Sequence, residues 1–568
     1  MSFLKRQWIF HKSDETAIKE ISKSFSLSAP ISQVLLNRGL KTPKDIEFFL
    51  NPKLSFLRDP FEIPDMEKAV DKTLTFVKDK KDIFVWGDYD TDGVTGTSII
   101  MLCLKKLGAN AKYYIPHRYN EGYGLNKVGI EKIAKSGGQL LITVDCGISN
   151  FDEIEYAKSI GIDVIVTDHH NLPEKLPNAF ACVNPKIIKG DHPSKDLSGA
   201  GVAFKFVWAL LRRAGEKNSS VIKDFLDLAA LGTIADVVPL TGENRILAVS
   251  GIKLLNQKKR HGVKCLVEAA KFDGEINSKE ISFILAPRLN APGRLRHAEL
   301  SLKLLLENDP QKAKLIADEI NIINTQRQQI GSLIGEDVFS RIKDVDRAKL
   351  IVLSGKNWHP GVIGIVASKI SEKFNRPSIL ISDNGKTCRG SARSIDGFDI
   401  YNLLKTCHDI FLDFGGHKDA AGFEISSDLL EEFKNRISQK IDVYCSFEEL
   451  IPKTKIDAEA KLDDITLDFA MQVNRLSPFG QGNLNPVFMT PSLKISSISK
   501  IGANGNHLKI QLFDGASNSS AVGFGFGELF GKIKKGMKVD IAYNVFLDKW
   551  NGDIFPKIRL VDIRRAEQ

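Results

Sequence analysis

The stretch Ile83-Phe84-Val85-Trp86-Gly87-Asp88-Tyr89-Asp90-Thr91-Asp92-Gly93 decides the fold of this chain. Its first four residues are an apolar run, and the glycines and aspartates that follow end the run abruptly, as at the end of a buried strand. Two further apolar runs, 140–144 and 163–167, have a similar length, and segments with helical patterning separate the three. This alternation predicts an α/β fold with a parallel, doubly wound sheet.

Polar residues follow each of these runs. The second run leads into Asp145, the third leads into Asp168-His169-His170, and a later apolar run, 228–235, leads into Asp236. We interpret the later run as a further strand. Because parallel strands end at the same edge of a sheet, we expect all of these side chains to lie in one crevice.

Five or six carboxylates and two imidazoles in one crevice favour a metal centre. An unpaired buried carboxylate is costly, and divalent cations would balance the charge. Mixed Asp and His ligands suit Mn²⁺ or Mg²⁺ better than a thiolate-preferring metal. Two such ions about 3.5–4 Å apart, with a bridging carboxylate, form a phosphoryl-transfer site.

Each part of this pattern also has a simpler interpretation. Residues 88–93 match the start of a calcium-binding EF-hand loop, but the twelfth position is Ile99 instead of a glutamate and a strand precedes the loop. Taken alone, Asp145 is a candidate helix cap and His169-His170 a candidate surface pair. Their joint occurrence at successive strand ends favours the metal centre.

The composition is that of a soluble globular protein, with 43% apolar and 26% charged residues. The 568 residues exceed the roughly 250–300 that one core accommodates, so two to four domains are expected. A net charge of +9 permits a nucleic-acid partner without requiring one. No apolar run reaches the roughly 18–20 residues that span a bilayer, no secretory signal is visible, and the seven cysteines form no C-x-x-C pair. We therefore expect a cytoplasmic protein with no membrane contact.

The rest of the chain changes character twice. Asp309-Pro310 predicts the start of a long helix, which either connects two domains or packs on the first one. A second α/β region follows from about 348 to 445. After about 455, short alternating strands and turn signals predict a small all-β module.

The motifs 87–93, 144–147, 167–170 and 232–236 resemble the four motifs of the DHH phosphoesterase superfamily, and most closely those of the RecJ family of single-strand-specific 5′→3′ DNA exonucleases. The resemblance implies two divalent cations, with Asp145 as the bridging ligand. It also implies that Asp145, Asp168 and His170 act in catalysis. The implied metal ligands are Asp88, Asp90, Asp92, Asp145, His169 and Asp236, and the division of roles among the first three stays open.

Further segments extend the resemblance over nearly the whole chain. Residues 287–294 and 477–483 are similar to RecJ segments, although Pro292 stands where alanine is expected. Residues 359–364, 389–394 and 415–422 resemble the DHHA1 domain. The implied substrate-binding residues are Arg288, Asn290, Arg294, Arg389, Ser391, Arg393, Gly415, Gly416 and His417.

These residue types suit phosphate binding. Glycines let backbone N–H groups approach an anion, and arginine supplies bidentate donors. Ser391 and Arg393 would share one face of a strand. The alternatives are a tight turn at Gly415-Gly416 and, for residues 288–294, packing against the long helix.

The C-terminal module resembles the OB domain of the same family. Aromatic residues interleaved with lysines suit single strands, because stacking contributes about 1–3 kcal/mol per base. Some of these aromatics must instead fill the barrel interior. The candidates are Phe524, Phe526, Tyr543, Phe546 and Trp550.

The resemblance implies a metal-dependent exonuclease that degrades single-stranded DNA from the 5′ end to 5′-mononucleotides, in recombination and repair. Single-strand binding protein and a DNA helicase are the implied partners. The alternatives are a related phosphodiesterase for short oligonucleotides or cyclic dinucleotides, and a non-catalytic single-strand-binding relative. The expected domains are an N-terminal segment (1–55), a DHH domain (56–308), a connecting helix (309–345), a DHHA1 domain (346–450) and an OB-like domain (455–568).

Overall fold

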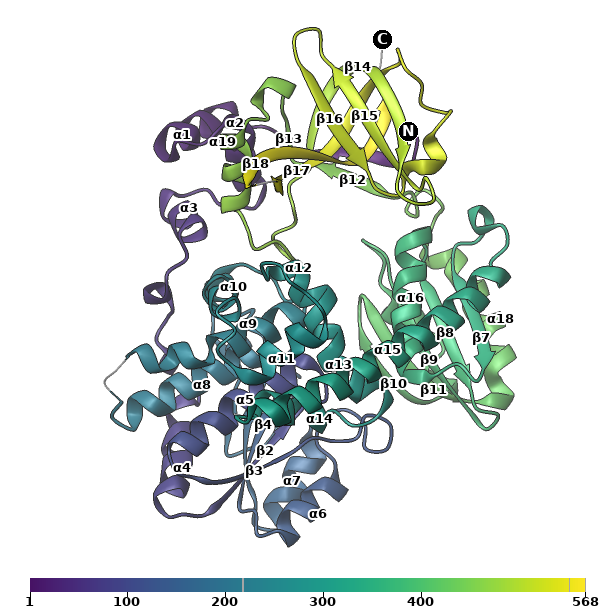
Figure 1. Ribbon diagram of the computed structural model, residues 1–568. Coiled ribbons are helices and arrows are strands. Elements are labelled where there is room, and N and C mark those ends of the chain that lie inside the picture. The colour runs from purple at the N-terminus through teal and green to yellow at the C-terminus, as the bar shows by residue number, and fades with distance from the viewer. Residues whose placement is uncertain (217–218, 551, 567–568) are drawn as a thin grey trace. The chain divides into compact units, whose positions relative to one another are not determined.

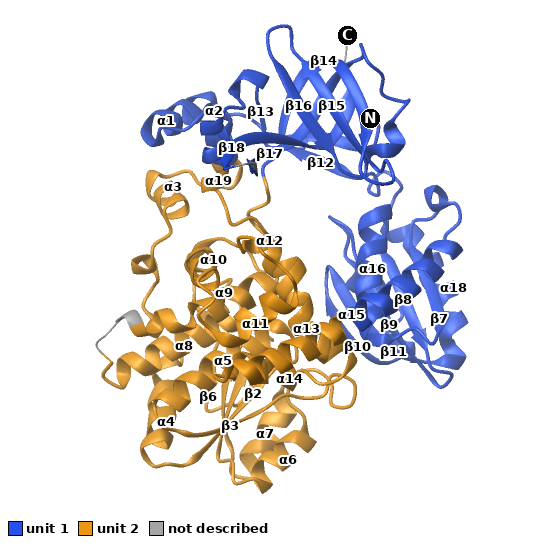
Figure 2. Ribbon diagram, viewed as in Figure 1, with its two compact units in different colours: residues 1–34, 325–473, 486–568 blue, residues 35–324, 474–485 orange. Residues whose placement is uncertain are grey.

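The computed structural model describes residues 1–216, 219–550 and 552–566 (Figure 1). The chain divides into two compact units (Figure 2). Unit 2 comprises residues 35–324 and 474–485, and unit 1 comprises 1–34, 325–473 and 486–568. A short segment of the C-terminal part of the chain therefore belongs to unit 2.

The sheet of unit 2 is parallel, as the sequence predicts, and it has five strands. Its strand order is β3-β2-β4-β5-β6, and every neighbouring pair is parallel. The chain runs from β2 to β3 on one side of β2, then crosses to β4 on the other side and continues outward to β5 and β6. The sheet therefore has a topological switch point between β2 and β4. The strands are β2 (Asp82–Gly87), β3 (Asn110–Tyr114), β4 (Leu140–Val144), β5 (Asp163–Thr167) and β6 (Ala181–Val183).

Both faces of this sheet are covered by helices, because its strands are apolar on both faces. Ile83 and Val85 lie in the same core as residues of α5 (Thr91–Lys106), α8 (Gly199–Arg213) and α9 (Leu226–Ala235). Phe84 and Trp86 point the other way, into a core with residues of α6 (Lys127–Lys135) and α7 (Phe151–Ser159). The remaining longer helices of the unit are α3 (Pro43–Leu50), α4 (Met66–Lys78), α10 (Gly242–Leu255), α11 (His261–Ala269), α13 (Ala286–Leu295) and α14 (Glu299–Leu306).

The expected strand before Asp236 is wrong. Residues 226–235 form helix α9, whose residues from Leu226 to Ile234 are all buried. A short run that is apolar on every side has neither a helical nor a strand period, so the pattern cannot distinguish the two. Asp236 is the C-terminal cap of this helix.

The long helix α15 (Pro310–Arg341) starts where the sequence predicts. The Asp309 carboxylate accepts hydrogen bonds from the backbone N–H groups of Gln311 and Lys312, which caps the helix. The division between the two units falls within this helix, between Asn324 and Thr325. The helix therefore contributes residues to both units, and its first part also packs in the core of unit 2.

The second α/β region has a five-stranded sheet of order β10-β11-β9-β8-β7. Only β7 and β8 are parallel, and α16 (Pro360–Phe374) joins them. The strands are β7 (Ile351–Lys356), β8 (Ser378–Asp383), β9 (Thr387–Arg393), β10 (Phe411–His417) and β11 (Ala420–Ser426); α17 (Ile400–Lys405) and α18 (Leu430–Tyr444) complete the region.

The C-terminal module is a closed barrel (Figure 1). Its strand order is β13-β14-β15-β16-β18-β17, and an additional pairing of β14 with β17 closes it. Helix α19 (Leu467–Arg475) precedes most of its strands. These are β13 (Ala458–Glu459), β14 (Phe488–Ile501), β15 (His507–Phe513), β16 (Asn518–Gly523), β17 (Lys538–Trp550) and β18 (Asp553–Arg565).

The aromatic residues of the barrel divide between its interior and its surface. Tyr543 and Phe526 are buried, whereas Phe524 and Phe546 are 57% and 36% exposed. The side chain of Trp550 lies outside the described residues. Only the exposed residues are available for stacking on bases.

The N-terminal segment, whose role the sequence left open, is ordered. Strand β1 (Gln7–Phe10) pairs in parallel with β12 (Lys453–Ile456), and the Trp8 indole donates to the Asp562 carboxylate at 2.8 Å. Helices α1 (Glu15–Phe25) and α2 (Ala29–Asn37) follow. No helix in the described part of the chain is long and apolar enough to cross a membrane.

Candidate metal centre

The predicted acidic residues of unit 2 lie at the carboxyl edge of its sheet. Asp88 follows β2 and Asp145 follows β4, so the two flank the switch point. Asp168 follows β5. Asp236 reaches the same place from the end of helix α9, so its expected position is confirmed although its expected element is not.

The potential ligand atoms form three overlapping groups, and within each group all the atoms lie within 4.8 Å of one another. Asp145 belongs to two of the groups, and His169 belongs to two. Such sharing suits neighbouring ions that have ligands in common. The groups are Asp145, His169 and His170; Asp92, His169 and Asp236; and Asp88, Asp90 and Asp145.

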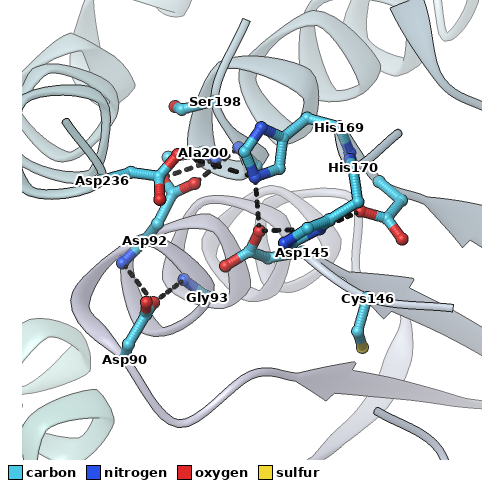
Figure 3. Close-up of polar contacts among 12 residues, drawn as sticks. Asp90, Asp92, Gly93, Asp145, Cys146, His169, His170, Ser198, Ala200 and Asp236 are labelled. Carbon is cyan, nitrogen blue, oxygen red and sulfur yellow. Dashed lines mark hydrogen bonds and ion pairs between the residues drawn. The ribbon is translucent and has the colours of Figure 1, made fainter. Parts of the chain in front are cut away.

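Several of these atoms are buried and have no hydrogen-bond partner among the described residues, namely Asp88 Oδ1, Asp145 Oδ1, His169 Nε2 and Asp236 Oδ2. His169 Nε2 points between two carboxylates, 3.0 Å from Asp145 Oδ1 and 3.5 Å from Asp236 Oδ2 (Figure 3). These separations are short, but hydrogen-bond geometry is absent. Buried polar atoms normally have partners, so this set of oxygen and imidazole donors fits divalent cations.

Burial and mutual repulsion disfavour the charged carboxylates when no cation is present. Burial, followed by the charge of Asp90, raises the pKa of Asp88 to about 8 and that of Asp92 to about 7. Burial, followed by the charge of Asp92, raises the pKa of Asp236 to about 9 and that of Asp145 well above its ordinary value. Protons therefore compete with cations for these oxygens.

The two histidines differ. Burial and the neighbouring His170 lower the pKa of His169 to about 3, so its imidazole is neutral and can act as a ligand. Burial is the largest single influence on the pKa of His170 and lowers it, but the hydrogen bond from the ring to Asp168 and the charges of Asp168 and Asp88 together raise it above its ordinary value. His170 is also the more exposed of the two, at 33% of its side chain.

Backbone N–H groups orient two of the acids. Asp90 caps helix α5 by accepting from the N–H groups of Asp92 and Gly93 at 2.9 and 3.1 Å. Asp92 accepts from the N–H groups of Gly199 and Ala200 at 2.6 and 2.9 Å, at the start of α8. Two helix N-termini thus stabilise negative charge at the site.

Glycines provide the space for the acids. A Cβ on Gly93 would lie 2.7 Å from the Asp88 backbone N, and one on Gly199 would lie 2.6 Å from Asp145 Cβ and 2.7 Å from Asp145 Oδ1. A Cβ on Gly232 would lie 2.6 Å from Asp92 Oδ1. Asp145 itself has φ +62°, a strained conformation for a residue other than glycine. The packing around the carboxylates therefore leaves no room for a side chain at these three glycines.

Asp168 anchors the loop that carries both histidines. Its Oδ1 accepts from the N–H groups of His169 and His170 and contacts His170 Nδ1 at 2.8 Å, and its Oδ2 accepts from Ile148 N–H. Burial alone raises the pKa of Asp168, but His170 reverses this and the net pKa is lowered. Asp168 is in none of the three ligand groups, so it positions His170 without being a candidate ligand.

The sequence analysis missed three neighbours of this site. The Tyr123 hydroxyl donates to the Asp145 carbonyl at 2.9 Å and lies 3.2 Å from His170 Nδ1. The charge of the half-buried Lys186 lowers the pKa of Asp236 and of His169. Gly199 was not singled out, although the glycine-rich segment Ser198-Gly199-Ala200-Gly201 was a visible signal.

The predicted substrate-binding residues of helix α13 make internal contacts. Arg288 donates to Asn321 Oδ1 of α15 at 3.0 Å and to the Ile284 carbonyl at 2.8 Å. The contact with α15 agrees with the alternative that these residues pack against the long helix. The Asn290 side chain accepts from Thr91 N–H at 2.8 Å, at the start of α5. The Arg294 carbonyl accepts from the Tyr119 hydroxyl. A role of these residues in binding DNA stays a prediction.

The remaining predicted substrate-binding residues lie in unit 1. Arg389, Ser391 and Arg393 alternate with buried residues along β9, and Arg393 donates to Ser391 Oγ at 3.0 Å. A Cβ on Gly364 of helix α16 would lie 2.8 Å from both Arg393 Nη2 and Ser391 Oγ, so this glycine leaves room for them. Gly415, Gly416 and His417 lie on the last half of β10, which pairs with β11 and is not a tight turn.

The raised pKa values predict how pH affects stability. An unfolded aspartate has a pKa near 4, so between about pH 4 and pH 7–9 the folded site without metal binds protons that the unfolded chain has released. The stability of the chelated protein should therefore fall as the pH rises through this window. Cations release those protons, so Mn²⁺ should raise the unfolding midpoint more at pH 8 than at pH 6. Thermal unfolding with chelator or with Mn²⁺ at both pH values measures this, and an equal or larger shift at pH 6 would contradict the assignment.

Three family models match the chain, namely the DHH family N-terminal domain at residues 82–233, the DHHA1 domain at 347–442 and the RecJ OB domain at 456–562. The single-stranded-DNA-specific exonuclease RecJ of Bacillus subtilis is 36% identical over 99% of this chain and 71% of that protein. The crystal structure of Thermus thermophilus RecJ with Mn²⁺ matches with a TM-score of 0.85 and 29% identity, over 100% of this chain and 80% of the other. The Mg²⁺ complex of that protein matches with a TM-score of 0.79 and 28% identity, over 99% and 79%. The chain belongs to the RecJ family of single-stranded-DNA-specific exonucleases.

Proposed function

We propose that this protein hydrolyses single-stranded DNA from the 5′ end with two divalent cations, Mn²⁺ or Mg²⁺, and releases 5′-mononucleotides. The observation that carries the proposal is that two groups of ligand atoms lie side by side, because His169 Nε2 of one is 3.0 Å from Asp145 Oδ1 of the other. The groups are Asp92, His169 and Asp236, and Asp88, Asp90 and Asp145. The relatives named above are single-stranded-DNA-specific exonucleases, and one is described with either metal. The polarity and the products come from the family resemblance.

In this proposal Asp88, Asp90, Asp92, Asp145, His169 and Asp236 would hold the ions. The family resemblance implies that Asp145 would be the ligand common to both. Bound divalent ions supply Lewis acidity, which lowers the pKa of water and neutralises charge on the phosphate. The raised pKa values of the carboxylates mean that the metal-free site takes up protons near neutral pH and releases them when cations bind. The affinity for metal should therefore increase as the pH rises.

His170 is the proposed donor to a phosphoryl oxygen. Its hydrogen bond to Asp168 fixes the ring, and its raised pKa increases the fraction that is protonated near neutral pH. A charged donor aimed at developing negative charge favours the transition state. Asp168 and Tyr123 are positioning residues in this scheme, because both contact His170.

Phosphate binding is the proposed role of the polar face of β9 and of the glycines of β10. Arg389, Ser391 and Arg393 share one face, which is accessible at intermediate exposure. Gly416 has φ +145°, which favours glycine. Gly415 and His417 are exposed beside it, and Arg288, Asn290 and Arg294 are proposed to contact the DNA backbone from unit 2. We also propose the domain boundaries that the sequence analysis gives, with the DHH domain at 56–308, the DHHA1 domain at 346–450 and the OB-like domain at 455–568.

The test of polarity uses strands labelled at one end. With Mn²⁺, a 5′-labelled single strand should release labelled mononucleotide in the first turnovers, whereas a 3′-labelled strand should release it last. A blunt duplex and a dinucleotide of the same sequence are the comparison substrates. Early release from the 3′ end, equal rates on blunt duplex, or a preference for the dinucleotide would refute the assignment.

The proposed partners are single-strand binding protein and a helicase that exposes the strand, and the proposed compartment is the cytoplasm. All seven cysteines are free and buried, which agrees with a reducing compartment. Exposed aromatics of the barrel, among them Phe524 and Phe546, support contact with single strands.

A further inference from the structure

The loop 477–485, which the DHH chemistry does not use, packs against the turn that follows Asp236. Residues 474–485 belong to unit 2, together with the metal centre. The Gln481 carbonyl accepts from Leu240 N–H at 2.8 Å. This backbone bond joins positions that are far apart in the chain.

Two glycines and one asparagine allow the loop to pack closely against residues 239 and 240. A Cβ on Gly480 would lie 2.7 Å from Leu240 Cδ1, and one on Gly482, which has φ +69°, would lie 3.0 Å from Pro239 Cβ. The fully buried Asn483 closes the loop by donating from Nδ2 to the carbonyls of Leu476 and Pro478, both at 2.8 Å. The loop therefore has one shape that fits the turn.

Two buried residues of helix α10 hold the loop and the turn by hydrogen bonds to their carbonyl groups. Arg245 donates to the Ser477 carbonyl at 2.9 Å, and Asn244 donates to the Pro239 carbonyl at 3.1 Å. From a third element, Ser278 Oγ donates to the Phe479 carbonyl at 2.7 Å. The loop and the turn are thus held in a common hydrogen-bonded frame.

The turn matters because the Asp236 carboxylate has little else to orient it. Asp92 is held by two backbone N–H groups, whereas Asp236 Oδ2 is buried and no described group donates a hydrogen bond to it. The next residue, Val237, has φ +62°, a strained conformation for a β-branched side chain, and is 64% exposed. Strain of this kind persists only where the surroundings hold it.

We propose that the loop 477–485 is a positioning element of the metal centre, which fixes residues 237–240 and thereby aims the Asp236 carboxylate at the cations. The inference rests on the proposed metal-dependent function. Outer contacts that orient a ligand typically change metal affinity about 10- to 100-fold when they are removed. The loop should act on the ion that Asp236 binds.

The test measures Mn²⁺ binding to the chelated full-length protein by calorimetry. Gly482→Ala should weaken the binding of one ion about 10- to 100-fold. Gly531→Ala is the matched control, because Gly531 also has a positive φ (+91°) but a Cβ there would meet nothing within 4 Å. Asn483→Ala, which removes the loop closure, is the second variant and should have the same effect.

A double-mutant cycle separates positioning from general destabilisation. In an Asp236→Asn background, Gly482→Ala should cause no further loss of affinity, whereas a loop that stabilises the whole unit would cause an additional loss. Unchanged Mn²⁺ affinity in Gly482→Ala and Asn483→Ala, or full additivity with Asp236→Asn, would overturn the inference. Absence of Mn²⁺ uptake by the unaltered protein would instead overturn the proposed function.

Discussion

Asp145→Asn should reduce exonuclease turnover by at least about 1,000-fold, which corresponds to about 4 kcal/mol of activation free energy. Asp145 lies between the ligand groups, is 3% exposed, and is 3.0 Å from His169 Nε2. Asparagine keeps the shape of the side chain and tolerates the φ of +62° at this position, so the variant removes charge with little effect on packing. Release of mononucleotides from a labelled single strand measures the rate.

The same variant should increase the stability of the metal-free protein, although it decreases turnover. The negative charge of Asp145 is unfavourable there, because burial and the charges of Asp92 and Asp90 raise its pKa. Asp145→Asn should therefore raise the unfolding midpoint in chelator and reduce the further stabilisation by Mn²⁺. The exposed Asp273, which lies outside any helix or strand, is the control, and Asp273→Asn should change neither quantity. A rate close to that of the unaltered protein would contradict the metal scheme.

Gly199→Ala should reduce turnover about 100-fold or more without changing any charge. The added Cβ would lie 2.6 Å from Asp145 Cβ and 2.7 Å from its Oδ1, so the Asp145 carboxylate has to move. Overpacking of this kind costs about 1–3 kcal/mol of stability. The metal-binding isotherm and the single-strand degradation rate both report the displacement.

Gly335→Ala is the matched control for this prediction. Gly335 also lies in a helix, and a Cβ there would meet nothing within 4 Å. Alanine is favoured over glycine inside a helix by about 1 kcal/mol, so the control should be neutral or slightly stabilising. Normal Mn²⁺ affinity in Gly199→Ala would show that the site accommodates the methyl group and would overturn the packing argument.

Local patterns were sufficient for the elements that carry the acids. The apolar runs before Asp88, Asp145 and Asp168 have the length of buried strands, and the structure has β2, β4 and β5 at these positions. Asp309-Pro310 was sufficient to predict the start of α15. The run before Asp236 was misassigned, because a uniformly buried helix lacks the polar face that reveals its period.

The sequence by itself determined the parallel sheet, the edge at which its acids gather and the chemistry to which Asp and His are suited, because strand period, capping and ligand preference are properties of neighbouring residues. Only the tertiary structure placed His169 Nε2 between Asp145 and Asp236, opened the space at Gly199, and brought the Gln481 carbonyl to Leu240. These contacts join positions that are distant in the chain, so they depend on how whole elements pack. No local pattern encodes them.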